Sequence, residues 1–168
     1  MTPEFSRPLT LDRAHGAHRF EASADECAAL ARRFGLAGVG SLVVDFALDR
    51  EDGDVRANGH LVAEVVQNCV ATGADVPARI EEAFALRFVP AAADHTSDET
   101  ELESDACEDI EHDGLTIDLG EAAAQTLALA IDPFPRAPDA DAALKSAGVL
   151  SEDEAGPFAA LKGLFEKP

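Results

Sequence analysis

The sequence predicts an α+β protein: an antiparallel sheet, open or barrel-like, with two or three packed helices and an acidic disordered loop. Apolar and polar residues alternate along three consecutive segments, at 42–48, 55–69 and 76–89, as in half-buried strands joined by short turns. Other segments repeat apolar residues every three or four positions, as one face of a helix does. After these strands, the segment 94–113 holds ten acidic residues in twenty.

The N-terminal part predicts two short strands. Phe5, Leu9 and Leu11 occupy odd positions, which suits a strand that Pro8 confines to the edge of a sheet. A second short strand is expected over 18–22.

A helix is predicted over 24–34, because Ser23 and Glu26 form a capping-box pair ahead of an apolar stripe. Arg32 and Arg33 lie in its last turn, where the helix dipole favours cations, and a glycine follows as a suitable end residue. The apolar stripe consists of Cys27, Leu30, Ala31 and Phe34.

The three long strands are expected to form a meander that carries the core. A turn at 51–54 joins the first two strands, and a turn at 72–75 leads into the third. Gly59 interrupts the second strand and predicts a bulge or a sharp bend there. The faces expected to point inward consist of Leu42, Val44, Phe46 and Leu48, of Val55, Ala57, Leu61, Ala63, Val65 and Cys69, and of Phe84, Leu86 and Phe88.

Acidity is the most unusual property of the chain, whose formal net charge is −20. Residues 1–93 hold nine basic and fourteen acidic side chains, whereas 94–168 hold four and nineteen. The segment 94–113 has few bulky apolar residues, so it cannot offset its ordering entropy and is expected to be mobile. Such a charge repels phosphate backbones and anionic lipid and attracts basic proteins, or it serves only solubility; both interpretations stay open.

After the acidic segment, 115–119 is expected to form a strand that runs into a helix. Asp118 can cap that helix with Glu121 as its capping-box partner, and Pro133 ends it. The prolines of 132–138 predict a rigid, extended stretch. The apolar stripe of the helix consists of Leu119, Ala123, Leu127 and Ala130.

From there a polar, Ala-rich linker is expected to lead to a short C-terminal helix with Pro157 at its first position. The predicted organisation is therefore one domain over 1–138, with a flexible insertion at about 91–113, followed by a linker and helix over 139–168. The apolar face of the last helix consists of Phe158, Leu161 and Phe165.

Sequence motifs of the common enzyme classes are missing. The chain has no nucleotide-binding glycine loop ahead of a helix, no G-x-S-x-G elbow and no H-E-x-x-H helix. The pairs His15/His18 and Cys107/His112 fall short of the four ligands of a zinc site, which favours surface positions for them. No catalytic activity, cofactor, metal or small-molecule substrate is therefore expected.

Cysteine usage and hydropathy bear on the compartment. An odd count of three cysteines, Cys27, Cys69 and Cys107, with no C-x-x-C pair, argues against a disulfide framework and fits a reducing compartment. The N-terminus lacks an apolar secretory segment, and no apolar run approaches the length of a membrane span. These features favour a cytoplasmic protein without a membrane partner. Cys69 lies on the apolar face of its strand, where a packed core thiol is the simplest interpretation.

Six segments of the chain are informative when they are taken together. They are Phe5-Ser-Arg-Pro-Leu-Thr-Leu11, Leu61-Val-Ala-Glu-Val-Val-Gln-Asn-Cys69, Val76-Pro-Ala-Arg-Ile-Glu-Glu-Ala-Phe84, Ile117-Asp-Leu119, Leu129-Ala-Ile-Asp-Pro-Phe-Pro-Arg136 and Pro157-Phe-Ala-Ala-Leu161. In order and spacing these segments resemble the YceD family, bacterial and plastid proteins linked to accumulation of large-subunit ribosomal RNA, over nearly the whole chain, although no single motif is specific. Many relatives carry a C-x-x-C pair at the end of the long strand, where this chain has Val66 and Cys69, so a metal or redox role of that pair does not carry over.

The resemblance implies a non-enzymatic ribosome-biogenesis factor that supports synthesis, processing or accumulation of 23S rRNA and assembly of the large subunit. The expected partner is a basic ribosomal protein or a pre-50S particle, because a protein with a charge of −20 is poorly suited to phosphate contacts. One alternative is direct binding of 23S rRNA through an Arg-bearing face, although these arginines equally suit an ordinary solvated surface. Another is a small metal-dependent hydrolase that uses the acidic segment. The candidate partner-binding residues are Arg7, Arg32, Arg33, Arg79, Arg136, Pro133, Pro135 and Phe158.

Overall fold

The computed structural model describes residues 3–51, 53–91 and 108–149. The chain divides into two compact units, the first made of Met1–Val66 and Pro77–Asp132 and the second of Gln67–Val76 and Pro133–Pro168. The elements are, in chain order, β1 (Pro8–Thr10), the 3-10 helix η1 (Leu11–Arg13), β2 (Gly16–Glu21), α1 (Ala24–Phe34), β3 (Gly38–Glu51), β4 (Asp54–Asn68), β5 (Asp75–Pro90), β6 (Glu108–His112), β7 (Thr116–Asp118), α2 (Leu119–Ala130) and α3 (Ala140–Ser146).

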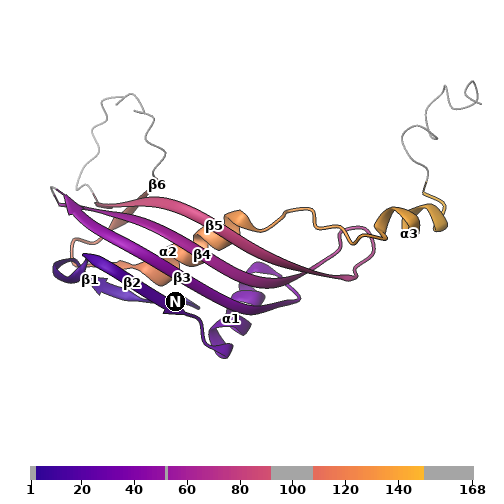
Figure 1. Ribbon diagram of the computed structural model, residues 1–168, viewed down its shortest axis with the longest axis horizontal. Coiled ribbons are helices and arrows are strands. Elements are labelled where there is room, and N and C mark those ends of the chain that lie inside the picture. Colours follow the sequence, from indigo (N-terminus) through magenta and orange to yellow (C-terminus); the bar gives the residue numbers. More distant parts are fainter. Residues whose placement is uncertain (1–2, 52, 92–107, 150–168) are drawn as a thin grey trace, which may run out of the picture. The chain divides into compact units, whose positions relative to one another are not determined.

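The main sheet has five strands in the order β2-β3-β4-β5-β6 (Figure 1). Strand β3 is antiparallel to both β2 and β4, whereas β6 is parallel to β5. A smaller sheet pairs β1 with β7 in the antiparallel sense, with Leu9 opposite Ile117. The α+β prediction and its meander of three long strands are confirmed, and the main sheet is open rather than barrel-like.

One face of the main sheet packs against α1 and α2 and forms the core of the first unit. The alternation predicted for the long strands is confirmed, because Leu42, Val44 and Leu61 are fully buried. Leu30 of α1 and Leu127 of α2 are fully buried as well. Burial of one such side chain stabilises a fold by about 1.5–3 kcal/mol, so this shared core holds the helices on the sheet.

Helix α1 begins and ends as the sequence predicts. The Ser23 hydroxyl accepts a hydrogen bond from the Glu26 backbone N–H at 3.3 Å, and the Glu26 carboxylate accepts one from the Ser23 N–H at 2.8 Å. The helix ends at Gly35, whose φ of 65° is left-handed and therefore favours glycine. The capping box and the end residue are both confirmed.

Gly59 marks a close approach between strands rather than the predicted bulge. The β3–β4 register runs through it without a shift, with Phe46 opposite, and the only irregularity between those strands lies at Val39 and Ser41. A Cβ atom on Gly59 would lie 2.1 Å from the Phe84 ring. The absence of a side chain therefore lets the aromatic ring of β5 lie over strand β4.

Strand β6 occupies the last part of the segment predicted to be a mobile loop. It pairs with β5 from Leu86 opposite Glu108 to Pro90 opposite His112. Ile110 packs against the core from this strand, which its acidic neighbours do not suggest. The loop prediction is wrong for Glu108–His112, and residues 92–107 lie outside the described residues.

His112 at the end of β6 is buried, so the predicted surface position is wrong for this residue. Its Nδ1 accepts a hydrogen bond from the Gly114 backbone N–H at 3.0 Å. His15 is exposed as predicted, whereas His18 is half-buried with its ring stacked beside Phe20. Cys107 lies outside the described ranges.

Strand β7 leads directly into α2, and Asp118 caps the helix as predicted. Its carboxylate accepts hydrogen bonds from the backbone N–H groups of Gly120 and Glu121 at 3.0 and 3.1 Å. The Glu121 side chain does not complete a capping box. It accepts hydrogen bonds from Arg33 and Gln125 instead, because a guanidinium from α1 offers it a charged partner.

The second unit joins the β4–β5 turn to the proline-rich stretch. The Val70 backbone N–H donates to the Pro135 carbonyl at 2.9 Å, and Cys69 packs in a small apolar cluster with Ala137 and Ala140. Helix α3 lies where the sequence predicts only a linker. The predicted division at residue 138 stays a prediction, and the helix expected at 157–165 lies outside the described residues.

Candidate partner-binding surfaces

Arg7 holds the N-terminal segment against α1. Its guanidinium donates to both carboxylate oxygens of Glu26, at 2.6 and 3.0 Å, and lies over the Phe5 ring at 4.4 Å from the centroid. The hydrogen bonds from Arg7 lower the pKa of Glu26 to about 2. The charge of Arg7 is therefore neutralised by Glu26, and the main role of this side chain is structural.

Arg33 joins α1 to α2 and to the N-terminal segment. It donates to both oxygens of Glu121, at 2.7 and 2.6 Å, and to Glu4 at 3.1 Å. The hydrogen bond from Arg33 lowers the pKa of the Glu121 carboxyl, and the same pairing raises the pKa of the guanidinium. Bidentate geometry of this kind fixes the angle between two elements as well as balancing charge.

The other three candidate arginines have different surroundings. Arg32 is exposed, and within the described ranges it forms no ion pair. Arg79 projects from the face of β5 opposite to Ile80, which points into the core, and it pairs with Glu81 beside it. Arg136 belongs to the second unit and pairs with Asp141 at 3.2 Å.

Three further arginines, all on strands of the main sheet, also form ion pairs. Each pair lies on exposed strand positions, where an ion pair contributes at most about 1 kcal/mol. The pairs nevertheless lower the number of guanidinium groups that are free to bind a phosphate. They are Arg19 with Asp45, Arg56 with Glu51, and Arg87 with Asp109.

The candidate residues of the proline-rich stretch have different surroundings. Pro133 is exposed, whereas Pro135 is buried and its carbonyl accepts the hydrogen bond from Val70. Phe134 between them is 72% exposed and is not one of the candidate residues predicted from the sequence. Phe158 lies outside the described residues.

Cys69 is buried in the second unit, which confirms the predicted packed thiol. Its sulfur accepts a hydrogen bond from the Ala137 backbone N–H at 3.2 Å. Hydrogen bonds from Ala137 and from the Thr72 hydroxyl lower the pKa of this thiol to about 7, because they stabilise the thiolate. Burial instead raises the pKa of Cys27.

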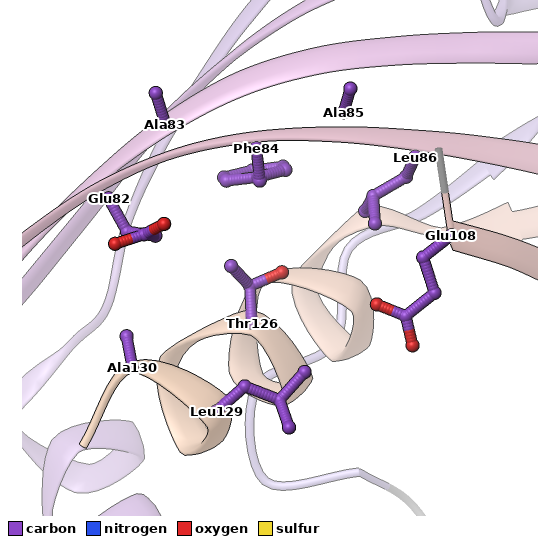
Figure 2. Close-up of a pocket in the computed structure, with 9 residues that line it drawn as sticks. All are labelled: Glu82, Ala83, Phe84, Ala85, Leu86, Glu108, Thr126, Leu129 and Ala130. Atoms are coloured by element: carbon purple, nitrogen blue, oxygen red, sulfur yellow. The ribbon is translucent and has the colours of Figure 1, made fainter. Parts of the chain in front are cut away.

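A groove of about 350 Å³ lies between β5 and α2 (Figure 2). Glu82, Phe84 and Leu86 point from β5 toward the helix, as Figure 2 shows. Across from them, Leu129 stands at the rim and is 76% exposed. The lining residues are Glu82, Ala83, Phe84, Ala85, Leu86, Glu108, Thr126, Leu129 and Ala130.

All charges around this groove are negative. Glu82 and Glu108 are exposed, and neither forms an ion pair with a residue that the structure describes. The last turn of α2, which contains Leu129 and Ala130, has no basic residue to balance the partial negative charge of a helix C-terminus. The groove therefore combines an apolar wall with a negative rim, which suits an amphipathic, basic ligand.

Sequence reasoning did not predict this groove. Glu82 stands in the register of β5 that points inward, between buried Ile80 and half-buried Phe84. The carboxylate of Glu82 at an inward-pointing position is the feature of the sequence that could have indicated the groove. A charged carboxylate needs water around it, so the space beside Glu82 must be open to solvent.

The model of the YceD family, described as large ribosomal RNA subunit accumulation protein YceD, matches residues 57–165. The chain belongs to the YceD family. The resemblance predicted from the sequence is thereby confirmed, and the matched range contains the groove and the described part of the second unit. No curated protein and no solved structure matches the chain.

The name of the YceD family refers to accumulation of ribosomal RNA and not to a reaction. In the part of the chain that the structure describes, no three His, Cys, Asp or Glu side chains gather into a potential metal site. No helix within the described ranges has the length and apolar character that a membrane span requires.

Proposed function

We propose that this YceD-family chain is a non-enzymatic, cytoplasmic ribosome-biogenesis factor. It supports synthesis, processing or accumulation of 23S rRNA, and thereby assembly of the large subunit, by binding a basic ribosomal protein or a pre-50S particle. The family match over residues 57–165 is the observation that supports a role in this pathway. The nature of the partner rests on charge, because a chain of net charge −20 attracts basic proteins.

The ion pairs of the first unit favour a protein partner over naked RNA. Arg7 and Arg33 would each have to leave a bidentate carboxylate before they could bind a phosphate. Their carboxylates would then face the RNA without a counterion. Arg79 is similarly paired with Glu81, so the Arg-bearing face of the rRNA-binding alternative has few available cations.

Loss of the gene tests the pathway. We expect a deficit of large subunits on a sucrose gradient and a lower ratio of 23S to 16S rRNA, both restored by the full-length chain. A normal subunit ratio together with normal 23S rRNA would contradict the proposed function.

Purification of the tagged full-length chain from growing cells tests the kind of contact. Basic large-subunit proteins should remain bound after ribonuclease treatment and dissociate as salt is raised, because salt screens the charges. A complex that contains rRNA and is lost entirely on ribonuclease treatment would instead support the direct RNA-binding alternative.

A further inference from the structure

A second cavity, of about 400 Å³, lies between β6, the turn that follows it and the N-terminal half of α2. We call it the β6–α2 cavity, and it shares no lining residue with the β5–α2 groove. Within the described ranges, no Lys or Arg lines it. Its negative charge comes from Glu111, Asp113, Asp118 and Glu121. Such a lining attracts cations, but acidic residues alone do not define a site.

His112 adds a buried hydrogen-bond donor to this cavity. The side chain is 6% exposed, and it lines the cavity. Its Nδ1 accepts a hydrogen bond from the Gly114 backbone N–H, so the proton of the neutral ring is on Nε2. In the part of the chain that the structure describes, the buried Nε2 has no hydrogen-bond partner. Because an unpaired buried donor is destabilising, this position favours a ligand that brings an acceptor.

The carboxylates of the cavity differ in what already binds them. Asp118 accepts four hydrogen bonds within the fold, and Glu121 is paired with Arg33. Asp113 accepts hydrogen bonds from two backbone N–H groups of the following turn, at 2.8 and 2.9 Å, but forms no ion pair with any described residue. These two hydrogen bonds lower the pKa of its carboxyl, so Asp113 is charged at neutral pH. It is therefore the carboxylate that suits a cationic ligand.

The donor and the carboxylate together select the class of ligand. A protonated polyamine would pair with Asp113 but has no acceptor for His112, whereas a phosphate has acceptors but is repelled by the carboxylates. A metal ion would need the lone pair that the protonated Nε2 lacks, and no three potential ligands gather in the described ranges. A peptide with a Lys or Arg residue offers a cation and a main-chain carbonyl at once.

We propose that the β6–α2 cavity binds a Lys or Arg residue of a basic partner protein. The cationic side chain pairs with Asp113, and a main-chain carbonyl of the same segment accepts a hydrogen bond from His112 Nε2. This inference rests on the proposed function, in which the partner is a basic ribosomal protein, and it adds the binding site and the two contacts that recognise the segment.

NMR titration of the full-length chain, with isotope-labelled histidine, tests both contacts. The probe is a blocked Gly-Arg-Gly peptide, and His112→Asn identifies the signal of Nε2–H. We expect that signal to move downfield as its hydrogen bond forms. The same peptide with citrulline in place of Arg keeps the carbonyls without the charge, and it should bind at least about threefold more weakly. Spermidine, which has charge without a carbonyl, should leave the signal unchanged.

Three results of this titration would overturn the proposal. No change in the Nε2–H signal at millimolar Arg peptide would mean that an ordered water alone occupies the site. Equal binding of the citrulline peptide would remove the ion pair. The same shift with spermidine would remove the carbonyl contact.

Single variants separate the two contacts. Asp113→Asn keeps an oxygen for the backbone N–H groups of its turn, and it should weaken binding of the Arg peptide at least about threefold. Asp49→Asn removes the same charge from an exposed position of β3 outside the cavity, and it should change affinity less than about 1.5-fold. In His112→Asn the amide oxygen can replace Nδ1 as acceptor, but no group reaches the position of Nε2, so binding should weaken about two- to tenfold. Equal weakening by both Asp variants, or unchanged binding in His112→Asn, would refute the site.

Cross-linking in cells identifies the occupant. A photo-reactive amino acid replaces Leu115, which is 72% exposed and follows Asp113 in the same turn. We expect an adduct with a basic ribosomal protein that falls about threefold when Asp113→Asn is added and persists with Asp49→Asn. No adduct, an adduct only with RNA, with a second copy or within the chain itself, or equal adducts in both backgrounds would overturn the proposal.

Failure of this inference and failure of the proposed function give different results. A large-subunit deficit in the deletion strain, together with a chain that does not bind the Arg peptide, would reject the cavity and leave the biogenesis role in place. A normal ribosome profile with normal 23S rRNA would reject the role itself, whereas the titration would still decide whether the cavity binds the peptide.

Discussion

Gly120→Ala should destabilise the protein, although helix propensity alone predicts the opposite. Gly120 lies in the first turn of α2, where replacement of glycine by alanine in an unobstructed helix stabilises by up to about 1 kcal/mol. A Cβ at this position would lie 2.6 Å from the Phe5 carbonyl oxygen and 2.8 Å from the Arg7 backbone nitrogen. Both are backbone atoms, so no side-chain rotation relieves the contact.

The destabilisation can be estimated from the hydrogen bonds that the N-terminal segment would lose if it moved away from Gly120. The Arg7 N–H donates to the Asp118 carboxylate at 2.7 Å, and the Leu119 N–H donates to the Arg7 carbonyl at 3.2 Å. Weakening these bonds costs about 1 kcal/mol each, and an overpacked contact costs about 1–3 kcal/mol. After the gain in helix propensity is subtracted, we expect a net loss of about 2–4 kcal/mol in the free energy of unfolding.

Urea unfolding followed by far-ultraviolet circular dichroism measures this loss, because the chain has neither Trp nor Tyr as an intrinsic fluorophore. Gly38→Ala is the control, since no atom lies within 4 Å of its ideal Cβ. That variant should match the parent protein or exceed it slightly. A Gly120→Ala variant as stable as the parent would refute the argument from backbone contact.

Three further predictions rest on single contacts. Gly59→Ala should lower the free energy of unfolding by about 1–3 kcal/mol, because the Phe84 ring must move away from the added methyl group. Gly40→Ala is the control, since the nearest atom to its Cβ lies at 3.6 Å, and it should change stability by less than about 1 kcal/mol. Equal effects of the two variants would contradict the close packing of Phe84 on Gly59. The pKa of Glu26 is about 2 in the folded protein and about 4.5 ordinarily, so the unfolded chain binds more protons between these values. Its stabilising contribution should therefore be complete above about pH 4.5 and be lost as the pH falls toward 2. Acid unfolding of Glu26→Gln should lack that part of the pH dependence, and an unchanged profile would refute it. In a variant that keeps Cys69 as its one cysteine, thiolate absorbance at 240 nm should rise with a midpoint near pH 7, and Thr72→Ala should raise the midpoint. A midpoint near 9 in both proteins would disprove the hydrogen-bonded thiolate.

The sequence predicts the parts of the fold that local pattern determines. The three long strands and the two helices of the first unit each bury one face, and that burial imposes a period of two or of 3.6 on the apolar residues. The caps of α1 and α2 are equally local, because Ser23 and Asp118 bond to N–H groups two or three residues away. The predicted bounds are therefore close for β4, β5 and the two helices, whereas the strand predicted over 42–48 extends over Gly38–Glu51.

Strand β6 escaped prediction because its stability comes from a neighbour distant in sequence. Its composition is acidic, yet Asp109 accepts two hydrogen bonds from Arg87 on β5, at 2.8 and 2.7 Å, and Ile110 packs on the core. Pairing with β5 thus offsets an unfavourable local propensity. No pattern within Glu108–His112 contains this information.

The candidate site was harder to predict for the same reason. The sequence supplies the number of arginines but not their partners, and Arg33 and Glu121 are 88 positions apart. Whether a guanidinium is free depends on such long-range pairs. The proposed basic patch could therefore be listed from the sequence, whereas its neutralisation could be seen only in the fold.

The pairing of the arginines changes the meaning of the net charge. When Arg7, Arg33 and Arg87 each neutralise a carboxylate inside the first unit, the surplus negative charge falls on carboxylates that have no such partner. Glu82 and Glu108 are two of these, and both line a groove that also has an apolar wall. Charge alone would attract any basic molecule, and an apolar wall alone would accept any apolar one. A ligand that fits both features is basic and partly apolar, and a phosphate backbone is neither.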